Sequence, residues 1–185
     1  MASPSERAHA YDPAMKRIVI TGAECTGKSS LTQALSGYYG EPWSPEYVRE
    51  YVHLLDRELT QKDLAAIFDG QLSIEDAGLS KATQFVLHDT NLLSSIIYAN
   101  HYYGAVRDDV NELFLKRDYT LYLLCTPAGI DWQADPGQRD SPQARAELQV
   151  KFKESLDTLQ LPYVELSGDK TVRFGEAIRA IDAVL

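Results

Sequence analysis

Apolar and polar positions along the chain form two patterns that alternate from one end to the other. Short apolar runs predict strands at 16–21, 84–88, 119–125 and 162–166. Prolines on both sides of 43–44 leave room there only for a short strand or an extended link. The runs at 16–21 and 84–88 do not alternate, which is typical of strands buried on both faces. Apolar residues in longer segments predict helices over 28–40, 46–55, 60–81, 91–103, 108–116, 142–159 and 171–184. This order predicts an α/β fold with helices on both faces of a parallel sheet.

Capping residues agree with several of these boundaries. Gly37 or Gly40 is suited to end the first helix, because glycine adopts the left-handed conformation found there. Thr60 precedes Asp63 by three residues, which is the spacing of an N-terminal cap. We therefore expect the helices to begin and end close to the residues that the apolar pattern indicates.

Length and composition predict a single domain over 16–185 that follows a flexible N-terminal tail at 1–15. A chain of 185 residues is long enough to bury an α/β core without disulfides or structural metal. The tail lacks the apolar core of a signal peptide, and no run of about 18 apolar residues occurs to span a membrane. The two cysteines have no metal-binding spacing. We therefore expect a cytoplasmic protein.

The formal net charge of -9 limits the partners that the sequence predicts. A negatively charged surface repels phosphate backbones unless basic residues gather in one place, and the sequence shows no basic cluster. We therefore expect no long nucleic acid as a partner, and a small anionic ligand held locally by backbone amides and a few cations.

Residues 22–29 carry the most specific motif of the chain, Gly-Ala-Glu-Cys-Thr-Gly-Lys-Ser, which has the G-x-x-x-x-G-K-[ST] pattern of a P-loop. A predicted strand precedes it and a predicted helix follows it, as this motif requires. Backbone amides of such a loop surround phosphates, the lysine reaches the outer phosphates, and the serine hydroxyl binds Mg²⁺. We predict a nucleotide site formed by Gly22, Glu24, Cys25, Thr26, Gly27, Lys28, Ser29 and Ser30.

The bound nucleotide is predicted to be ATP. The N-K-x-D signature with which GTPases read guanine is absent, and so is their D-x-x-G switch. Asp89 closes the apolar strand at 84–88, where a carboxylate can orient Mg²⁺ or accept a proton from an attacking hydroxyl. We predict Ser29 and Asp89 as the metal-binding residues, with a simple helix cap as the alternative for Asp89.

Glu46 and Arg49 follow the predicted second strand, one helical turn apart and on the same face. A carboxylate and a guanidinium in this position would orient a substrate hydroxyl for attack on phosphorus. The alternative is a surface ion pair worth under about 1 kcal/mol. Spacing alone leaves the two interpretations open, and Asp89 and Glu46 are both candidates for the catalytic base.

The segment 126–141 is rich in proline, glycine and aspartate, and Ser141-Pro142 after it is typical of a helix start. We predict a lid here, because phosphoryl transfer needs positive charge over the separating phosphates and exclusion of water. Arg139 is the candidate for that charge, and a solvated connector is the alternative. The candidates for stacking on a flat ligand, of which at least half should be core, are Trp43, Tyr47, Tyr51, Tyr98, Tyr102 and Trp132.

Four segments together resemble the ribosylnicotinamide kinase module of the NadR proteins and the wider NadR-like P-loop ATPases. They are the P-loop, Glu-Tyr-Val-Arg-Glu-Tyr-Val at 46–52, Asp-Thr-Asn at 89–91, and the lid from Asp131-Trp132 to Arg139. The resemblance implies a five-stranded parallel sheet in the order 2-3-1-4-5, ATP with Mg²⁺, and phosphorylation of a nucleoside 5′-hydroxyl. It places the acceptor near Glu46, Tyr47, Arg49, Asp89, Asn91 and Trp132.

The chain departs from that family where Pro45 replaces a tryptophan, where Asn91 replaces a second aspartate, and where Pro136 interrupts an Asp-Gly pair. These positions lie on the side that would hold the nicotinamide. The leading hypothesis is an ATP-dependent kinase that converts nicotinamide riboside to nicotinamide mononucleotide. The alternatives are a kinase for another nucleoside-like acceptor, an ATP-binding regulatory module with little turnover, and a polynucleotide-end kinase, which would need a basic channel.

Overall fold

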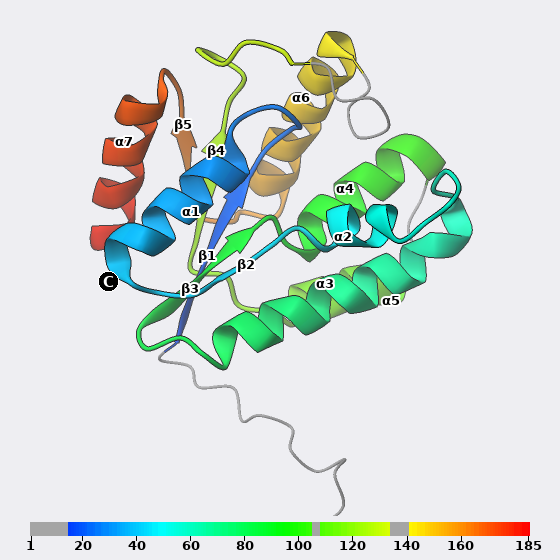
Figure 1. Cartoon of the computed structure of the whole chain (residues 1–185), viewed down its shortest axis with the longest axis horizontal. Coiled ribbons are helices and arrows are strands. Elements are labelled where there is room, and N and C mark those ends of the chain that lie inside the picture. Colours follow the sequence, from blue (N-terminus) through cyan, green and yellow to red (C-terminus); the bar gives the residue numbers. More distant parts are fainter. Residues whose placement is uncertain (1–14, 105–107, 134–140) are drawn as a thin grey trace, which may run out of the picture.

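The computed structural model describes residues 15–104, 108–133 and 141–185. Its centre is a five-stranded parallel sheet in the order β2-β3-β1-β4-β5 (Figure 1). This confirms the predicted α/β fold and the predicted strand order. The strands are β1 (Lys16–Thr21), β2 (Trp43–Ser44), β3 (Phe85–Asp89), β4 (Leu121–Cys125) and β5 (Tyr163–Leu166).

The three middle strands form the buried centre of the sheet. In β1, Ile18 pairs in register with Leu87 of β3 on one side and with Leu121 of β4 on the other. All residues of β3 and β4 are buried, as is every residue of β1 except the first. Strand β5 lies at the edge and exposes two of its four residues. Burial on both faces, predicted for the runs at 16–21 and 84–88, is thus confirmed.

Helices cover both faces of the sheet, and each face has its own apolar core. Helices α1 and α7 lie on one face and α3, α4, α5 and α6 on the other (Figure 1). Alternate residues of β1 separate the two cores, because Ile18 and Ile20 point to the α1 side and Val19 to the opposite side. The helices are α1 (Lys28–Tyr39), α2 (Tyr47–His53), the 3₁₀ turn η2 (Gln61–Asp63), α3 (Leu64–Leu79), α4 (Leu92–Tyr103), α5 (Asp108–Leu115), α6 (Pro142–Thr158) and α7 (Lys170–Asp182).

The predicted caps are present in the structure. Gly40 ends α1 in the left-handed conformation with φ 71°, and its amide donates to Ser36 O. Thr60 and Asp63 form a reciprocal capping box around η2, so the predicted helix over 60–81 begins as one tight turn before α3. The Ser141 hydroxyl accepts from the Ala144 amide at 3.1 Å and caps α6.

All five strands point the same way, so their carboxyl ends share one edge of the sheet, at the top of Figure 1. The loop between β1 and α1 lies at this edge, together with the starts of α2 and α4. Ligands of open parallel sheets bind outside this edge. Among the described residues, no helix is both long enough and apolar enough to cross a membrane.

Candidate active site

The loop from Gly22 to Gly27 has the backbone shape of a phosphate cradle. Gly22 and Gly27 have φ of 126° and 82°, a region that residues with a side chain rarely adopt. A Cβ on Gly22 would lie only 2.4 Å from Cys125 O, so a larger residue would push the loop away from β4. Loops of this type turn successive amides toward an anion, and the start of α1 adds its dipole. The loop therefore fits a polyphosphate.

Lys28 and Ser29 begin α1 at the mouth of this loop. Lys28 is 5% exposed, and its ammonium donates to Ala23 O of the loop at 2.7 Å. The Ser29 side chain lies beside the carboxylate of Asp89, which ends β3 on the neighbouring strand, and acts to lower the pKa of that carboxyl. The structure thus brings together the two residues that we predicted as metal ligands.

The Asp89 carboxylate is buried, and its Oδ1 atom has no hydrogen-bond partner among the described residues. Burial raises the pKa of Asp89, as does the negative charge of Glu46, whereas the Ser29 side chain, Lys28 and Arg49 act in the opposite direction. An orphaned carboxylate oxygen beside a hydroxyl is a hard-oxygen donor set of the kind that suits Mg²⁺.

No group of three or more His, Cys, Asp or Glu side chains that would hold a metal by themselves is found within residues 15–104, 108–133 and 141–185. Mg²⁺ in phosphoryl-transfer enzymes is bound through one or two protein ligands, with substrate phosphates and water completing the shell. Ser29 and Asp89 therefore suffice as the protein part of such a site.

A cavity of about 680 Å³ opens beside the phosphate loop. Lys28 and Glu24 of the loop form one part of its wall, and α2, α3 and α4 supply most of the rest. Glu58 and Leu59, between α2 and η2, also line it, and the wall combines apolar and aromatic side chains with five charged ones. Its α4 side is made by Ser95, Tyr98, Ala99, Tyr102 and Tyr103. A cavity of this size fits a nucleoside.

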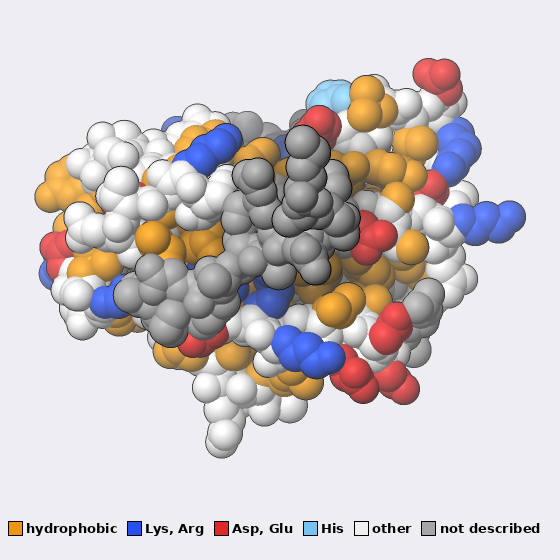
Figure 2. All heavy atoms as spheres, turned by 90° about the horizontal axis from the view of Figure 1, so that it is seen from below, with side chains coloured by type: hydrophobic (Ala, Val, Ile, Leu, Met, Phe, Trp, Pro, Cys, Tyr) orange, Lys and Arg blue, Asp and Glu red, His pale blue; other side chains and the backbone are white. Residues whose placement is uncertain are grey.

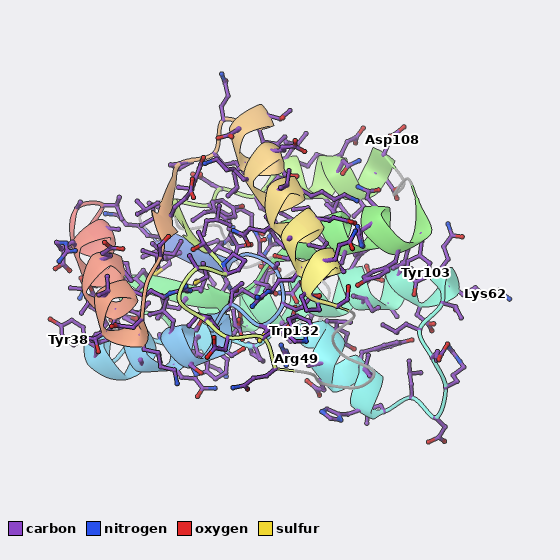
Figure 3. The ribbon with its side chains drawn as sticks, turned by 90° about the horizontal axis from the view of Figure 1, so that it is seen from above. Tyr38, Arg49, Lys62, Tyr103, Asp108 and Trp132 are labelled. Carbon is purple, nitrogen blue, oxygen red and sulfur yellow. The ribbon has the colours of Figure 1, made fainter. Side chains whose placement is uncertain are left out.

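Glu46 and Arg49 lie together on the α2 side of the cavity. The Arg49 Nε atom donates to Glu46 Oε2 at 2.7 Å, and both residues line the cavity. The Glu46 side chain is 13% exposed and that of Arg49 40%. The two residues therefore form an ion pair that faces the cavity, and a role of this pair in orienting a substrate hydroxyl stays a prediction. Arg49 projects from α2 in the view down on the carboxyl edge (Figure 3).

Glu24 extends from the phosphate loop into the wall of the same cavity. The Tyr98 hydroxyl donates to Glu24 Oε2 at 3.0 Å, while Oε1 is buried without a partner among the described residues. Burial and the charges of Glu46 and Glu24 raise the pKa of Tyr98, which keeps that phenol protonated. We predicted Glu24 as a nucleotide-binding residue, and the structure directs its side chain to the acceptor side.

Four of the residues predicted to lie near the acceptor are not part of the cavity wall: Asp89, described above, and Tyr47, Asn91 and Trp132. The Tyr47 ring packs against Gly70 of α3, where an added Cβ would be 2.0 Å from the ring. Asn91 is buried and donates from Nδ2 to the Tyr122 hydroxyl at 3.0 Å. Trp132 lies after β4 (Figure 3), and the Arg145 guanidinium is 5.3 Å from its ring centre. The lid was predicted over 126–141, and its residues 134–140, including Arg139, lie outside the described residues.

Sequence reasoning missed two arginines that brace the phosphate loop. Arg145 of α6 donates from Nη1 to Cys25 O and to Ile130 O, both at 3.3 Å. Arg173 of α7 is 3% exposed and spreads its donors over carbonyls of three loops. Its acceptors are the carbonyl oxygens of Thr26, Thr126, Ala128 and Gly168. Their acceptors are distant in sequence and are backbone atoms, so no motif could have identified these arginines.

The family model described as an AAA domain matches residues 17–173, which is most of the chain. The chain belongs to the AAA domain family. It is also similar in fold to a NadR protein solved in complex with NR, with a TM-score of 0.76 at 22% identity over 92% of this chain and 50% of that one. A NadR structure with NAD and AMP-PNP gives a TM-score of 0.73 at 22% identity over 92% and 49%.

Two kinases that act on nucleosides or nucleotides share the fold. A thymidylate kinase from Ehrlichia chaffeensis has a TM-score of 0.67 at 13% identity over 91% of this chain and 100% of that one. A deoxyadenosine kinase from M. mycoides with bound dATP has a TM-score of 0.62 at 14% identity over 90% and 99%. The chain spans about half the length of the NadR chains, and the expected resemblance to a P-loop kinase module is confirmed as a likeness of fold.

Proposed function

We propose that the protein transfers the γ-phosphoryl group of ATP to the 5′-hydroxyl of nicotinamide riboside. The observation that carries the proposal is an acidic, tyrosine-walled cavity that opens directly beside a phosphate loop. Three carboxylates line it, those of Glu24, Glu46 and Glu58. Two cations line it, of which Lys28 is required by the phosphates and Arg49 is paired with Glu46. The acceptor space therefore carries an excess of negative charge.

This charge favours an acceptor whose base is positively charged. Nicotinamide riboside carries a pyridinium ring, and a flat cation gains both from carboxylates and from the faces of aromatic rings. The tyrosines at 98, 102 and 103 supply such rings on the α4 side. A neutral nucleoside would gain the aromatic contact but not the charge attraction. The NadR protein with a similar fold was solved in complex with NR, which supports the same choice of acceptor.

Each predicted site residue has its own part in the proposed chemistry. Lys28 and the loop amides bind the phosphates, and Ser29 with Asp89 would hold Mg²⁺, which supplies charge neutralisation at the β- and γ-phosphates. Asp89 or Glu46 accepts the proton of the 5′-hydroxyl, and Arg49 orients the acceptor. Arg139 covers the transferring group in the proposed arrangement. Most of the rate gain comes from positioning and from electrostatic stabilisation of the transition state.

An assay of ADP release over a panel of acceptors tests the proposal. The panel contains nicotinamide riboside, its neutral reduced form, adenosine, cytidine, thymidine and a 5′-hydroxyl oligonucleotide. We expect the highest kcat/KM for nicotinamide riboside, with the product identified by mass. Uniform inactivity in a protein that binds ATP would contradict the proposal and favour a regulatory module. A neutral nucleoside as the best acceptor would contradict the charge argument alone.

The oligonucleotide serves as the negative control. On the face shown in Figure 2, the described lysines and arginines are scattered among acidic and apolar residues and do not form a continuous basic stripe. The net charge of -9 also opposes binding of a phosphate backbone. We therefore expect no phosphorylation of polynucleotide ends.

A further inference from the structure

Two polar residues lie in the core beneath the acceptor cavity, on the inner face of α3. Gln71 is 1% exposed and Glu75, one helical turn later, is 0% exposed. Burying an amide or a carboxylate is costly unless its atoms are hydrogen bonded. Neither Gln71 nor Glu75 is among the described residues that line the cavity, so direct contact with an acceptor does not explain why they are buried here.

The hydrogen bonds of Gln71 and Glu75 connect the start of α2 with the start of α4. Gln71 Oε1 accepts from the Tyr47 amide at 3.1 Å, and Gln71 Nε2 donates to Glu75 Oε1 at 3.3 Å. The same Glu75 oxygen accepts from the Leu92 amide at 3.0 Å. Tyr47 and Leu92 are thus joined through two side chains of α3.

The two joined amides occupy equivalent places in the fold. Tyr47 is the first residue of α2 and directly follows Glu46, whereas Leu92 is the first residue of α4 and follows Asp89 by three residues. The first amides of a helix have no acceptor within their own helix. Here side chains from α3 accept from both, so α3 fixes the starting points of the two helices that follow the candidate catalytic carboxylates.

The chain of hydrogen bonds from Tyr47 through Gln71 and Glu75 to Leu92, here called the relay, is also held by residues that bind the second oxygen of Glu75. Glu75 Oε2 accepts from the Tyr119 hydroxyl at 2.7 Å and lies 3.4 Å from Arg117 Nε. Burial raises the pKa of Glu75, and the Arg117 charge together with these hydrogen bonds opposes that rise. Glu75 therefore has four polar neighbours on two oxygens, and its orientation is fixed by all of them.

We propose that Gln71 and Glu75 are positioning residues that hold Glu46, which lines the acceptor cavity, at a fixed separation from Asp89, whose carboxylate lies within reach of the Glu46 charge. The inference rests on the proposed function, in which those two carboxylates act on the acceptor hydroxyl and the metal. The relay sets the acceptor geometry without touching the acceptor. A displacement of about 1 Å in such groups reduces rates by about 100-fold.

Gln71→Met is the main test, because it keeps the side-chain length and removes both the acceptor for the Tyr47 amide and the donor to Glu75. We expect kcat/KM for the acceptor to fall about 10–100-fold, with the KM for ATP changed less than about twofold. Glu75→Met should have an effect at least as large. Glu75→Gln keeps an oxygen for the Leu92 amide and should recover part of the lost activity.

Asp76→Asn is the matched control. Asp76 neighbours Glu75 on α3, its side chain is 54% exposed, and it is not a hydrogen-bond partner of Gln71 or Glu75. It binds Arg117, and asparagine keeps an oxygen for that contact. We expect wild-type kinetic constants from this variant. A role in stability alone would lower the melting temperature of the Gln71 and Glu75 variants and leave both kinetic constants of the folded enzyme unchanged, which would overturn the proposal.

Amide hydrogen exchange separates this inference from the proposed function. If the wild-type protein phosphorylates no acceptor, the proposed function fails, and the relay is then judged by exchange. Gln71→Met should increase exchange at Tyr47, and Glu75→Met should increase it at Leu92, while Asp76→Asn changes neither. Unchanged protection at both amides would overturn the relay, whatever the assay of activity shows.

Discussion

The two halves of the site are built in different ways. The phosphate side is made by consecutive residues, 22–29, and its binding groups are mostly backbone amides whose directions follow from two glycines with positive φ. The acceptor side is made by side chains from α2, α3 and α4, which are distant in sequence. A backbone site is specified by a short motif, whereas a side-chain site depends on how helices pack. The comparison explains why ATP follows from the sequence more directly than the acceptor does.

The largest expected effect distinguishes the roles of Asp89 and Glu46, the two candidates for the catalytic base. Asp89→Asn and Glu46→Gln are each nearly isosteric, and loss of a catalytic base costs about 100- to 10,000-fold in kcat. We expect one variant to show this loss and the other to raise mainly the KM for the acceptor. Steady-state kinetics with both substrates varied will identify the base. Equal, modest losses in both would show that neither carboxylate accepts the proton.

Lys28→Met tests the phosphate side. Removing a preorganised charge that stabilises the transition state costs about 100- to 1,000-fold. We expect that loss in kcat/KM for ATP, with binding of the acceptor, measured by calorimetry, nearly unchanged. Lys62→Met is the control, since Lys62 is exposed on η2, is not among the residues that line the cavity, and points away from the molecule (Figure 3). Equal effects of the two variants would contradict the assignment of Lys28.

A smaller effect is expected from Glu24→Gln, which removes one negative charge at the boundary between the two halves. The preference for nicotinamide riboside over its neutral reduced form should fall about 10-fold, because one cation–carboxylate interaction in a partly buried site is worth of the order of 1 kcal/mol. The ratio of the two kcat/KM values measures this directly. An unchanged ratio would place the charge selectivity elsewhere in the cavity.

The last effect concerns the stability of the folded protein rather than its activity, and it depends on His88 of β3. Burial, assisted by the Arg17 and Arg117 charges, lowers the pKa of His88 to about 3. An unfolded chain binds a proton at this histidine below about pH 6.5, whereas the folded protein does not, so the contribution of His88 to stability falls as the pH drops from there. The slope approaches about 1.4 kcal/mol per pH unit.

His88→Gln should remove that slope between pH 6.5 and 4, although it also disturbs the 2.7 Å hydrogen bond between His88 Nδ1 and Ser44 Oγ. Urea unfolding of both proteins across this range, in the presence of EDTA, measures the difference in pH dependence. Parallel curves would show that His88 does not titrate on unfolding as its burial requires.

The sequence was sufficient to predict the strands and the phosphate loop, because the patterns that mark them involve neighbouring residues. Apolar runs without alternation located β1 and β3, and the glycine-rich motif between a strand and a helix located the phosphate loop. The strand order was implied by the family resemblance and is confirmed by the pairing of β1 with both β3 and β4. The spacing of Glu46 and Arg49 likewise placed them on one helical face.

The sequence could not predict which tyrosines line the cavity and which pack in the interior. Tyr47, Tyr98 and Tyr102 were equivalent candidates in the sequence, yet the ring of Tyr47 packs on Gly70 while the other two line the cavity. Local spacing cannot distinguish these outcomes, because the choice depends on which helix lies opposite. The contact between Glu24 and Tyr98, and the chain from Tyr47 through Gln71 and Glu75 to Leu92, likewise join residues that no local pattern connects.

By itself, the sequence determined the helices and strands, the phosphate loop and the ends of the strands at which chemistry is placed. These features depend on backbone conformation and on periodic burial, which are properties of neighbouring residues. The tertiary structure alone decided which side chains face the acceptor, how far Glu46 lies from Asp89, and which buried groups hold them there. Those features depend on packing between helices, whose contacts are set across the whole chain.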